Sequence, residues 1–232
     1  MKKVLALALA LSIILCAVPA FAAGKLSVQQ ENFHIIKTYR LYGYLYAKVA
    51  NVGDRPIMVN TGLLEIFNAD GDALTSTDSY YAYAKYLQPD EYTYIRLYDE
   101  IEDVEASAVD DYMLTVTGKS NKDYVSRRLP VTTSYVPNVE AGYYTHNYMY
   151  ATYTNNLDEP VYGISIVLAL LDAEGNILYI TSDSMSSSNA LLPGSSITVR
   201  INVDSNFIEY FEENNLVPTT VDAIVYVNEE IK

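Results

Sequence analysis

Tyrosine is the residue of this chain whose abundance and spacing are best suited to binding a ligand. The 232 residues include 23 tyrosines, 5 phenylalanines and no tryptophan. In segments 42–48 and 92–98 every second residue is aromatic or basic, which places these side chains on one side of a β-strand. Aromatic and arginine side chains are enriched at binding hot spots. If the two strands are neighbours, we expect one ligand-binding surface, the tyrosine face, formed by Tyr42, Tyr44, Tyr46, Tyr92, Tyr94, Arg96 and Tyr98.

The same alternation has a simpler explanation. Tyrosine suits strands and tolerates a half-exposed position, with its ring packed and its hydroxyl in water. The rings could therefore serve only to form the strands, or they could be covered by another part of the chain.

Catalytic chemistry has few candidates in this sequence. The two histidines, His34 and His146, stand in no recognised motif, and no G-x-S-x-G, H-E-x-x-H or P-loop pattern occurs. Paired carboxylates could act as in a glycosidase, but among 29 acidic residues the sequence does not select a pair. We therefore predict that the chain is not an enzyme, and we assign no catalytic residue. A secreted hydrolase that uses acidic residues is the alternative.

Segment 68–72, Asn-Ala-Asp-Gly-Asp, is the closest approach to a metal-binding loop. A calcium loop of the EF-hand type has glycine at its sixth position and glutamate at its twelfth. Here glycine is fourth and the twelfth residue is Ser79. A hairpin turn is the better interpretation, so we predict no metal site and no cofactor, with weak surface binding of calcium left open.

The net charge of the chain limits the classes of partner that it is expected to bind. The formal net charge is −14 at pH 7. Nucleic acids and anionic membranes are bound through lysine and arginine, so we expect neither as a partner.

Residues 1–22 have the pattern of a signal peptide. Lys2 and Lys3 precede the apolar run 4–18, and Ala20-Phe21-Ala22 supplies small residues for cleavage. A membrane anchor is the alternative, but the run is short for a span. We expect a secreted or cell-envelope protein without a membrane span in the mature chain.

The rest of the chain contains an internal repeat. Segment 44–96 resembles segment 148–200, and the shared residues include Asn51, Asp54 and Pro56 at a turn cluster. Both segments read as short strands separated by turns. We predict an all-β protein of two tandem immunoglobulin-like β-sandwich domains, residues 24–129 and 130–232.

Two finer expectations follow from the strand pattern. The side chains of Leu45, Val49, Ile95 and Leu97 should point into the core of the first domain. Late in the repeat Val116 matches Val227, which implies extra residues near 207–217. The segment FIEYFEENN there predicts a short helix.

The turns resemble those of the bacterial FxLYD domain family. The defining stretch corresponds to residues 64–68, Leu-Glu-Ile-Phe-Asn, and to residues 168–172, Leu-Ala-Leu-Leu-Asp. The resemblance implies exported immunoglobulin-like modules and supplies no catalytic residues. We therefore expect an exported, non-catalytic module that binds an extracellular protein, a cell-wall polymer or a glycan.

Overall fold

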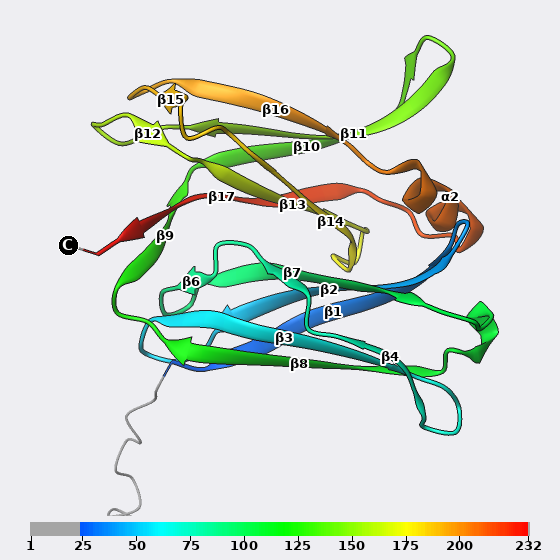
Figure 1. The fold of residues 1–232 in the computed structure, drawn as a ribbon. Helices are drawn as coiled ribbons and strands as arrows, with labels where there is room; N and C mark the ends of the chain where they lie inside the picture. Colours follow the sequence, from blue (N-terminus) through cyan, green and yellow to red (C-terminus); the bar gives the residue numbers. More distant parts are fainter. Residues whose placement is uncertain (1–23, 232) are drawn as a thin grey trace, which may run out of the picture.

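The computed structural model describes residues 24–231. The predicted signal peptide, residues 1–22, lies outside this range. The described chain is an all-β protein built of antiparallel sheets, as expected (Figure 1). No helix within residues 24–231 is long and apolar enough to cross a membrane.

The first half of the chain forms two sheets with a core between them. One sheet has the order β1-β2-β7-β5, and the other has the order β4-β3-β6, with β8 also paired to β3. Leu45, Val49, Ile95 and Leu97 lie in this core with 0% exposure, which confirms the predicted inward face. The strands are β1 (Leu26–Lys37), β2 (Leu41–Asn51), β3 (Ile57–Phe67), β4 (Ala73–Thr77), β5 (Tyr80–Ala82), β6 (Tyr86–Leu87), β7 (Tyr92–Ile101) and β8 (Asp111–Ser120).

The second half forms a three-stranded sheet, β10-β11-β16, a four-stranded sheet, β14-β13-β17-β9, and the short pair β12-β15. Helix α2 (Ser205–Glu213) confirms the short helix expected near 207–217, and a 3₁₀ turn, η1 (Ala106–Ala108), precedes β8. The strands are β9 (Tyr124–Leu129), β10 (Val131–Ala141), β11 (Tyr144–Thr154), β12 (Val161–Tyr162), β13 (Ser165–Leu171), β14 (Ile177–Ser184), β15 (Ala190–Leu191), β16 (Ser196–Asn202) and β17 (Thr220–Glu230).

Strand pairing bears on two details of the expected organisation. β9, which ends at the predicted boundary between residues 129 and 130, pairs with β17 in the sheet β14-β13-β17-β9. Val116 pairs with Gly62, and Val225 pairs with Ile166. Because Ile166 stands 104 positions after Gly62, Val116 corresponds to Val225 and not to Val227, and the insertion around α2 is shorter than expected.

The same pairing register occurs in both halves. Tyr44 pairs with Tyr98 between β2 and β7, and Tyr148 pairs with Asn202 between β11 and β16. Tyr148 stands 104 positions after Tyr44, and Asn202 stands 104 positions after Tyr98. The registers of β3-β4 and of β13-β14 also break at equivalent points, after Ile66 and after Leu170. The two halves therefore share the same strand register at these positions.

A buried asparagine fixes the turn at the end of the second strand in each half. The Asn51 amide nitrogen donates to the carbonyl oxygens of Arg55, at 2.8 Å, and Leu87, at 3.3 Å. Its side-chain oxygen accepts from the backbone nitrogen of Gly53 at 3.1 Å. Because the carbonyl and amide groups of a buried turn have no water to bond, one side chain satisfies three of them.

Asn155 repeats this arrangement 104 positions later. Its amide nitrogen donates to the carbonyl oxygens of Glu159 and Leu191, each at 2.8 Å, and its oxygen accepts from Leu157 N at 2.9 Å. Both asparagines are 0% exposed. Asparagine therefore occurs at both positions because its side chain makes the same set of backbone hydrogen bonds at each.

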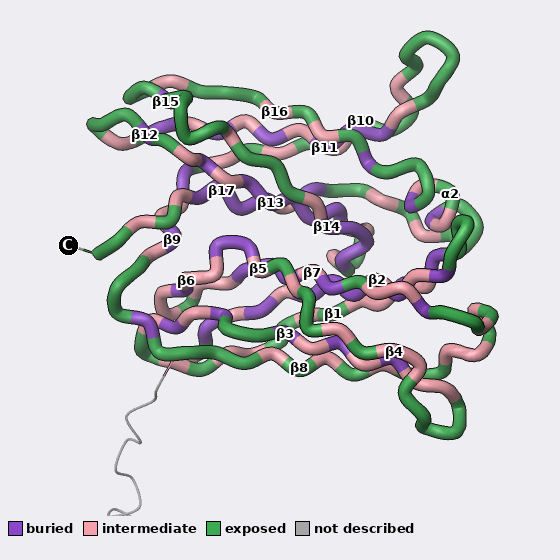
Figure 2. The backbone as a smooth tube through the Cα atoms, in the orientation of Figure 1, coloured by how far each residue is buried: buried purple, intermediate pink, exposed green. Residues whose placement is uncertain are grey.

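The four main sheets lie one above another, and β13 is in the middle of the stack (Figure 1). Residues 166–170 of β13 are all buried, whereas in β3 buried and less buried residues alternate over 64–67. A strand covered on both faces has a continuous apolar sequence. Figure 2 shows buried positions concentrated in the inner layers. The two halves therefore bury surface against each other.

We expect Asn155→Ala to lower the free energy of unfolding by about 2–4 kcal/mol, because it leaves buried backbone groups without partners. Urea denaturation measures this change. Asn176→Ala, in an exposed hairpin turn, is the control and should change stability by less than about 1 kcal/mol. Equal effects of the two substitutions would contradict the role of Asn155.

Candidate functional site

The structure places part of the tyrosine face between the two halves of the chain. Tyr46 and Tyr94 are each 1% exposed and belong to the core cluster of the second half. The Tyr46 ring lies 6.1 Å from that of Tyr179 in β14, measured between centroids. The expectation that all seven side chains share one open surface therefore needs correction, because the second half covers the centre of this face.

A carboxylate of the second half binds two of the predicted residues. The hydroxyls of Tyr92 and Tyr94 donate to Asp222 Oδ2 at 2.7 and 2.6 Å. Burial, together with the neighbouring Asp222, raises the pKa of both tyrosines, so both hydroxyls keep their protons at neutral pH. Arg128 also donates to the carbonyl oxygen of Tyr92. These residues hold the halves together and are not free to bind a ligand.

The outer part of the tyrosine face is only partly covered. Tyr98 is 37% exposed, and Tyr42, Tyr44 and Arg96 are intermediate. The Arg96 guanidinium lies 4.8 Å from the centroid of the Tyr81 ring. Ligand binding by this outer part stays a prediction.

We expect the double substitution Tyr92→Phe, Tyr94→Phe to lower the free energy of unfolding by about 2–4 kcal/mol. Both hydrogen bonds to a charged acceptor are lost while the rings remain. Thermal and urea unfolding measure the change, with Tyr98→Phe on the same strand as the control. An effect of the double substitution no larger than that of the control would show that Asp222 does not join the halves.

His34 is buried beside the same contact. It is 2% exposed, and its ring centroid lies 5.3 Å from Tyr210 in α2 and 5.8 Å from Tyr46. Its Nε2 atom has no hydrogen-bond partner in the described chain. Burial lowers the pKa of His34 to about 4, and backbone groups of Leu178 and Ile177 only partly oppose this effect. His34 is thus a neutral core residue at neutral pH.

This burial predicts a loss of stability in acid. A histidine whose folded-state pKa lies below its ordinary value stabilises the fold above about pH 6.5 and loses that contribution as the pH falls toward 4. The full shift corresponds to about 3 kcal/mol. Burial raises the pKa of Tyr46 and Tyr210, the titratable side chains against the ring, so both stay neutral in this range.

The measurement compares unfolding free energies at pH 7 and pH 4.5 for the natural protein and for His34→Phe. We expect the natural protein to lose about 2–3 kcal/mol more than the variant. An NMR titration in which His34 has a pKa near 6.5 would contradict the burial argument.

Helix α2 forms one end of the molecule and borders three hollows. The Asp204 side chain accepts a hydrogen bond from Asn206 N at 2.9 Å, which begins the helix with a side-chain cap. The buried face of the helix carries Phe207 and Phe211. The Phe207 ring packs 4.7 Å from Tyr179 and 4.9 Å from Tyr44, which fixes α2 over the contact between the halves.

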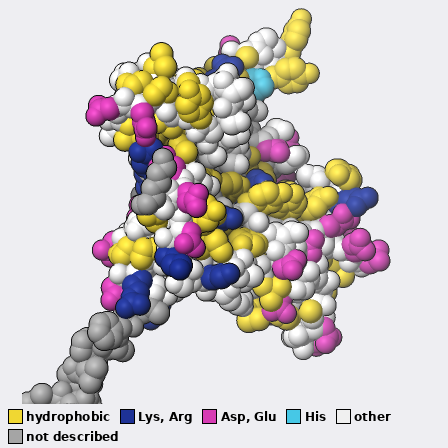
Figure 3. All heavy atoms as spheres, turned by 60° about the vertical axis from the view of Figure 1, so that its left-hand side comes forward, with side chains coloured by type: hydrophobic (Ala, Val, Ile, Leu, Met, Phe, Trp, Pro, Cys, Tyr) yellow, Lys and Arg dark blue, Asp and Glu magenta, His cyan; other side chains and the backbone are white. Residues whose placement is uncertain are grey.

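The opposite side of α2 borders a hollow of about 340 Å³, which we call the α2 hollow. It lies between the helix and the start of β11. The β10-β11 hairpin projects from the body beside it, with hydrophobic side chains at its tip (Figure 3). The hollow is lined by Tyr144, Thr145, His146, Asn147, Asn202, Val203, Ser205, Ile208, Glu209 and Glu212.

Further hollows continue along the same end. A hollow of about 310 Å³ shares Glu209 with the α2 hollow, and one of about 240 Å³ shares Asn147, Ile208 and Glu212 with it. A hollow of about 510 Å³ lies in the first half and shares Lys37 with the 310 Å³ hollow. Each of these four hollows therefore shares at least one lining residue with a neighbouring hollow.

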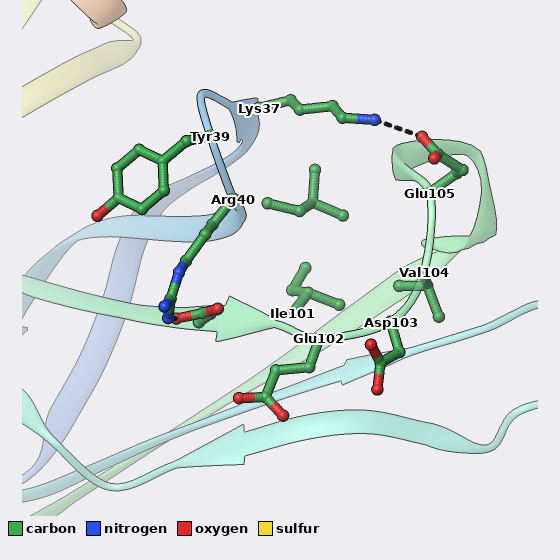
Figure 4. Close-up of a pocket in the computed structure, with 10 residues that line it drawn as sticks. Lys37, Tyr39, Arg40, Ile101, Glu102, Asp103, Val104 and Glu105 are labelled. Carbon is green, nitrogen blue, oxygen red and sulfur yellow. Dashed lines mark hydrogen bonds and ion pairs between the residues drawn. The ribbon is translucent and has the colours of Figure 1, made fainter.

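The 510 Å³ hollow is bordered by ion pairs that are formed within the protein. Lys37 Nζ lies 2.5 Å from Glu105 Oε2, and Arg40 lies 2.5 Å from Glu100 (Figure 4). The nearby ammonium of Lys37 lowers the pKa of Glu105. Exposed ion pairs of this kind add little stability. They nevertheless engage both basic side chains that line the hollow, Lys37 and Arg40.

Segment 68–72 is a hairpin turn, as expected. The side-chain oxygen of Asn68 accepts from the backbone nitrogens of Asp70, at 3.0 Å, and Asp72, at 2.8 Å. Gly71 has a φ of 82°, which glycine adopts without strain. No group of three or more potential metal ligands occurs within residues 24–231.

His146 lies within an aromatic row on the outer face of β11. Its ring stacks on Tyr148 with centroids 5.5 Å apart, and Tyr144 lies 6.4 Å away on the other side. The Arg200 guanidinium covers Tyr148 at 4.5 Å from the centroid. The sequence did not reveal the hollow beside this row, because only folding brings α2 to β11.

Comparisons with known proteins place the chain in no family. No family model matches it, and no curated protein matches it. Among solved structures the chain is similar to the crystal structure of red sea bream transglutaminase, with 12% identity and a TM-score of 0.23. The match covers 88% of this chain and 31% of that chain. A likeness this weak carries no argument about function.

Proposed function

We propose that the protein is an exported, non-catalytic module of two tandem immunoglobulin-like β-sandwich copies that binds a cell-wall polymer or another glycan. Export is inferred from the signal-peptide pattern of residues 1–22. The recurrence of strand register and of the asparagine turns supports the tandem copies. The fold by itself implies no activity, so the proposed binding rests on the surface.

The observation that carries the proposal is the series of hollows along one end, with an exposed tyrosine at a hairpin tip of each half. Tyr39, between β1 and β2, is 85% exposed, and Tyr143, between β10 and β11, is 101% exposed. They occupy equivalent positions, 104 residues apart. A long polymer can contact successive hollows, and aromatic rings offer it flat apolar surfaces.

A sedimentation assay tests this function. The mature protein, residues 23–232, is mixed with purified bacterial cell walls and, separately, with insoluble glycans. We expect the protein to pellet with at least one of them. The double substitution Tyr39→Ala, Tyr143→Ala should reduce the bound fraction several-fold without lowering the melting temperature, because both side chains are exposed.

Tyr124→Ala provides the matched control, since Tyr124 is also exposed but lies on β9, outside the series of hollows. Its binding should equal that of the natural protein. Failure of the natural protein to pellet with any wall or glycan would refute the proposal. Release of soluble reducing ends during the assay would instead support a hydrolase.

A further inference from the structure

We propose that the α2 hollow is a binding site for one uncharged sugar unit of a polysaccharide, with Asn147 as its principal hydrogen-bond donor. This inference rests on the proposed glycan-binding function and assigns it to a particular place. Four observations support it.

The first feature is an amide group prepared for a ligand. Asn147 is 7% exposed, and its side-chain oxygen accepts from Tyr135 OH and from Asn138 N, both at 3.2 Å. These two donors fix which end of the amide is oxygen. The amide nitrogen has no acceptor within the described chain, so its donor capacity is not used by the protein. Asn147 lines both the α2 hollow and the hollow next to it, so a ligand there can supply the acceptor.

The second feature is the contrast with the first half. Gly43 occupies the position equivalent to Asn147. A Cβ atom at Gly43 would lie 2.5 Å from Ile66 Cδ1 and 2.9 Å from Phe33 Cε2, so that position has no room for a side chain. The amide is therefore a property of the second half, which also has α2. It is not a requirement of the repeated strand pairing.

The third feature is the charge of the wall. Glu209 and Glu212 stand three residues apart on α2 and border the hollow from the same side. No lysine or arginine is among its described lining residues. The two carboxylates can accept hydrogen bonds from sugar hydroxyls, and they repel phosphate, sulfate and uronic acid groups. The wall thus disfavours an anionic ligand.

The fourth feature is the shape and size of the hollow. Tyr144 is 73% exposed and offers a ring at its edge. At about 340 Å³ the hollow lies near the lower limit of small-molecule sites, which is ~300 Å³. A single sugar ring is a suitable occupant, with the chain of a polymer continuing into the adjoining hollows.

A lysine side chain of a peptide is the competing occupant, since the carboxylates would attract it. An ammonium group has no acceptor, so it would leave the Asn147 amide nitrogen without a partner. The amide donor therefore favours a ligand that has oxygen atoms as well as hydroxyl donors.

The test is a titration of the mature protein, followed by NMR and calorimetry, with four probes. They are the uncharged N-acetylglucosamine tetrasaccharide, the cationic glucosamine tetrasaccharide, the anionic galacturonate tetrasaccharide and a trilysine peptide. We expect the uncharged probe to bind most tightly and to shift the side-chain amide signals of Asn147. The galacturonate probe should not bind.

Asn147→Asp separates a sugar from a cation. The aspartate retains an oxygen for Tyr135 and Asn138, but it replaces the amide donor with an acceptor. Affinity for the uncharged probe should fall about five- to tenfold, as expected for one lost hydrogen bond. Affinity for a cation would rise instead. Glu212→Gln, at an exposed helix position, is the second variant and should also weaken sugar binding if Asn147→Asp does not fold. Glu174→Gln, at an exposed hairpin position outside the hollows, is the control and should leave the affinity unchanged.

Three results would overturn the inference. They are preferential binding of trilysine or glucosamine that Asn147→Asp strengthens, no binding of the uncharged probe, or unchanged affinity in both Asn147→Asp and Glu212→Gln. If the natural protein and these variants pellet equally with cell walls, the proposed function stands and the site lies elsewhere. If the natural protein binds neither walls nor sugars, both proposals fail.

Discussion

The contact between the two middle sheets is the interaction on which the rest of the structure depends. Tyr46 and Tyr94 lose nearly all of their exposure there, and Asp222 binds the hydroxyls of Tyr92 and Tyr94. Phe207 of α2 packs against the rings of Tyr44 in β2 and Tyr179 in β14. The same contact therefore fixes the position of α2. The hollows along that end are therefore a consequence of how the two halves meet.

Much of the fold could be predicted from local sequence patterns. The period of two in β2 and β7 identifies the inward face, because alternate side chains of a strand point to opposite sides. Asn51 and Asn155 mark equivalent turns, because only a short amide side chain satisfies three backbone groups at once. The pairing of β9 with β17 was not predictable in this way, since it joins segments about 100 residues apart without a local signal.

The candidate site was less predictable, for two physical reasons. The alternation of β2 and β7 shows which side chains point outward but not whether another sheet covers them. The sequence of β13 does indicate that both of its faces are covered, because its run Ile-Val-Leu-Ala-Leu-Leu is apolar on both faces. In β3 the position equivalent to Ala169 is Glu65. The α2 hollow depends on Asn147 and Glu212, which are distant in the sequence and ordinary in type. Only their convergence distinguishes them.

The outward face of β11 and β16 lacks the groups that join the two halves of the chain. The positions equivalent to Tyr92 and Tyr94 are Ser196 and Thr198, and these hydroxyls bond to Thr154 and Thr152 within their own sheet at 2.7 and 2.8 Å. The position equivalent to Asp222 is Met113 in β8, which cannot accept such a bond. A repeat whose two outer faces matched each other would add further molecules end to end and grow into fibres. Here both the donors and the acceptor of the joining contact are missing from the outer faces, so neither end of the stack can continue it.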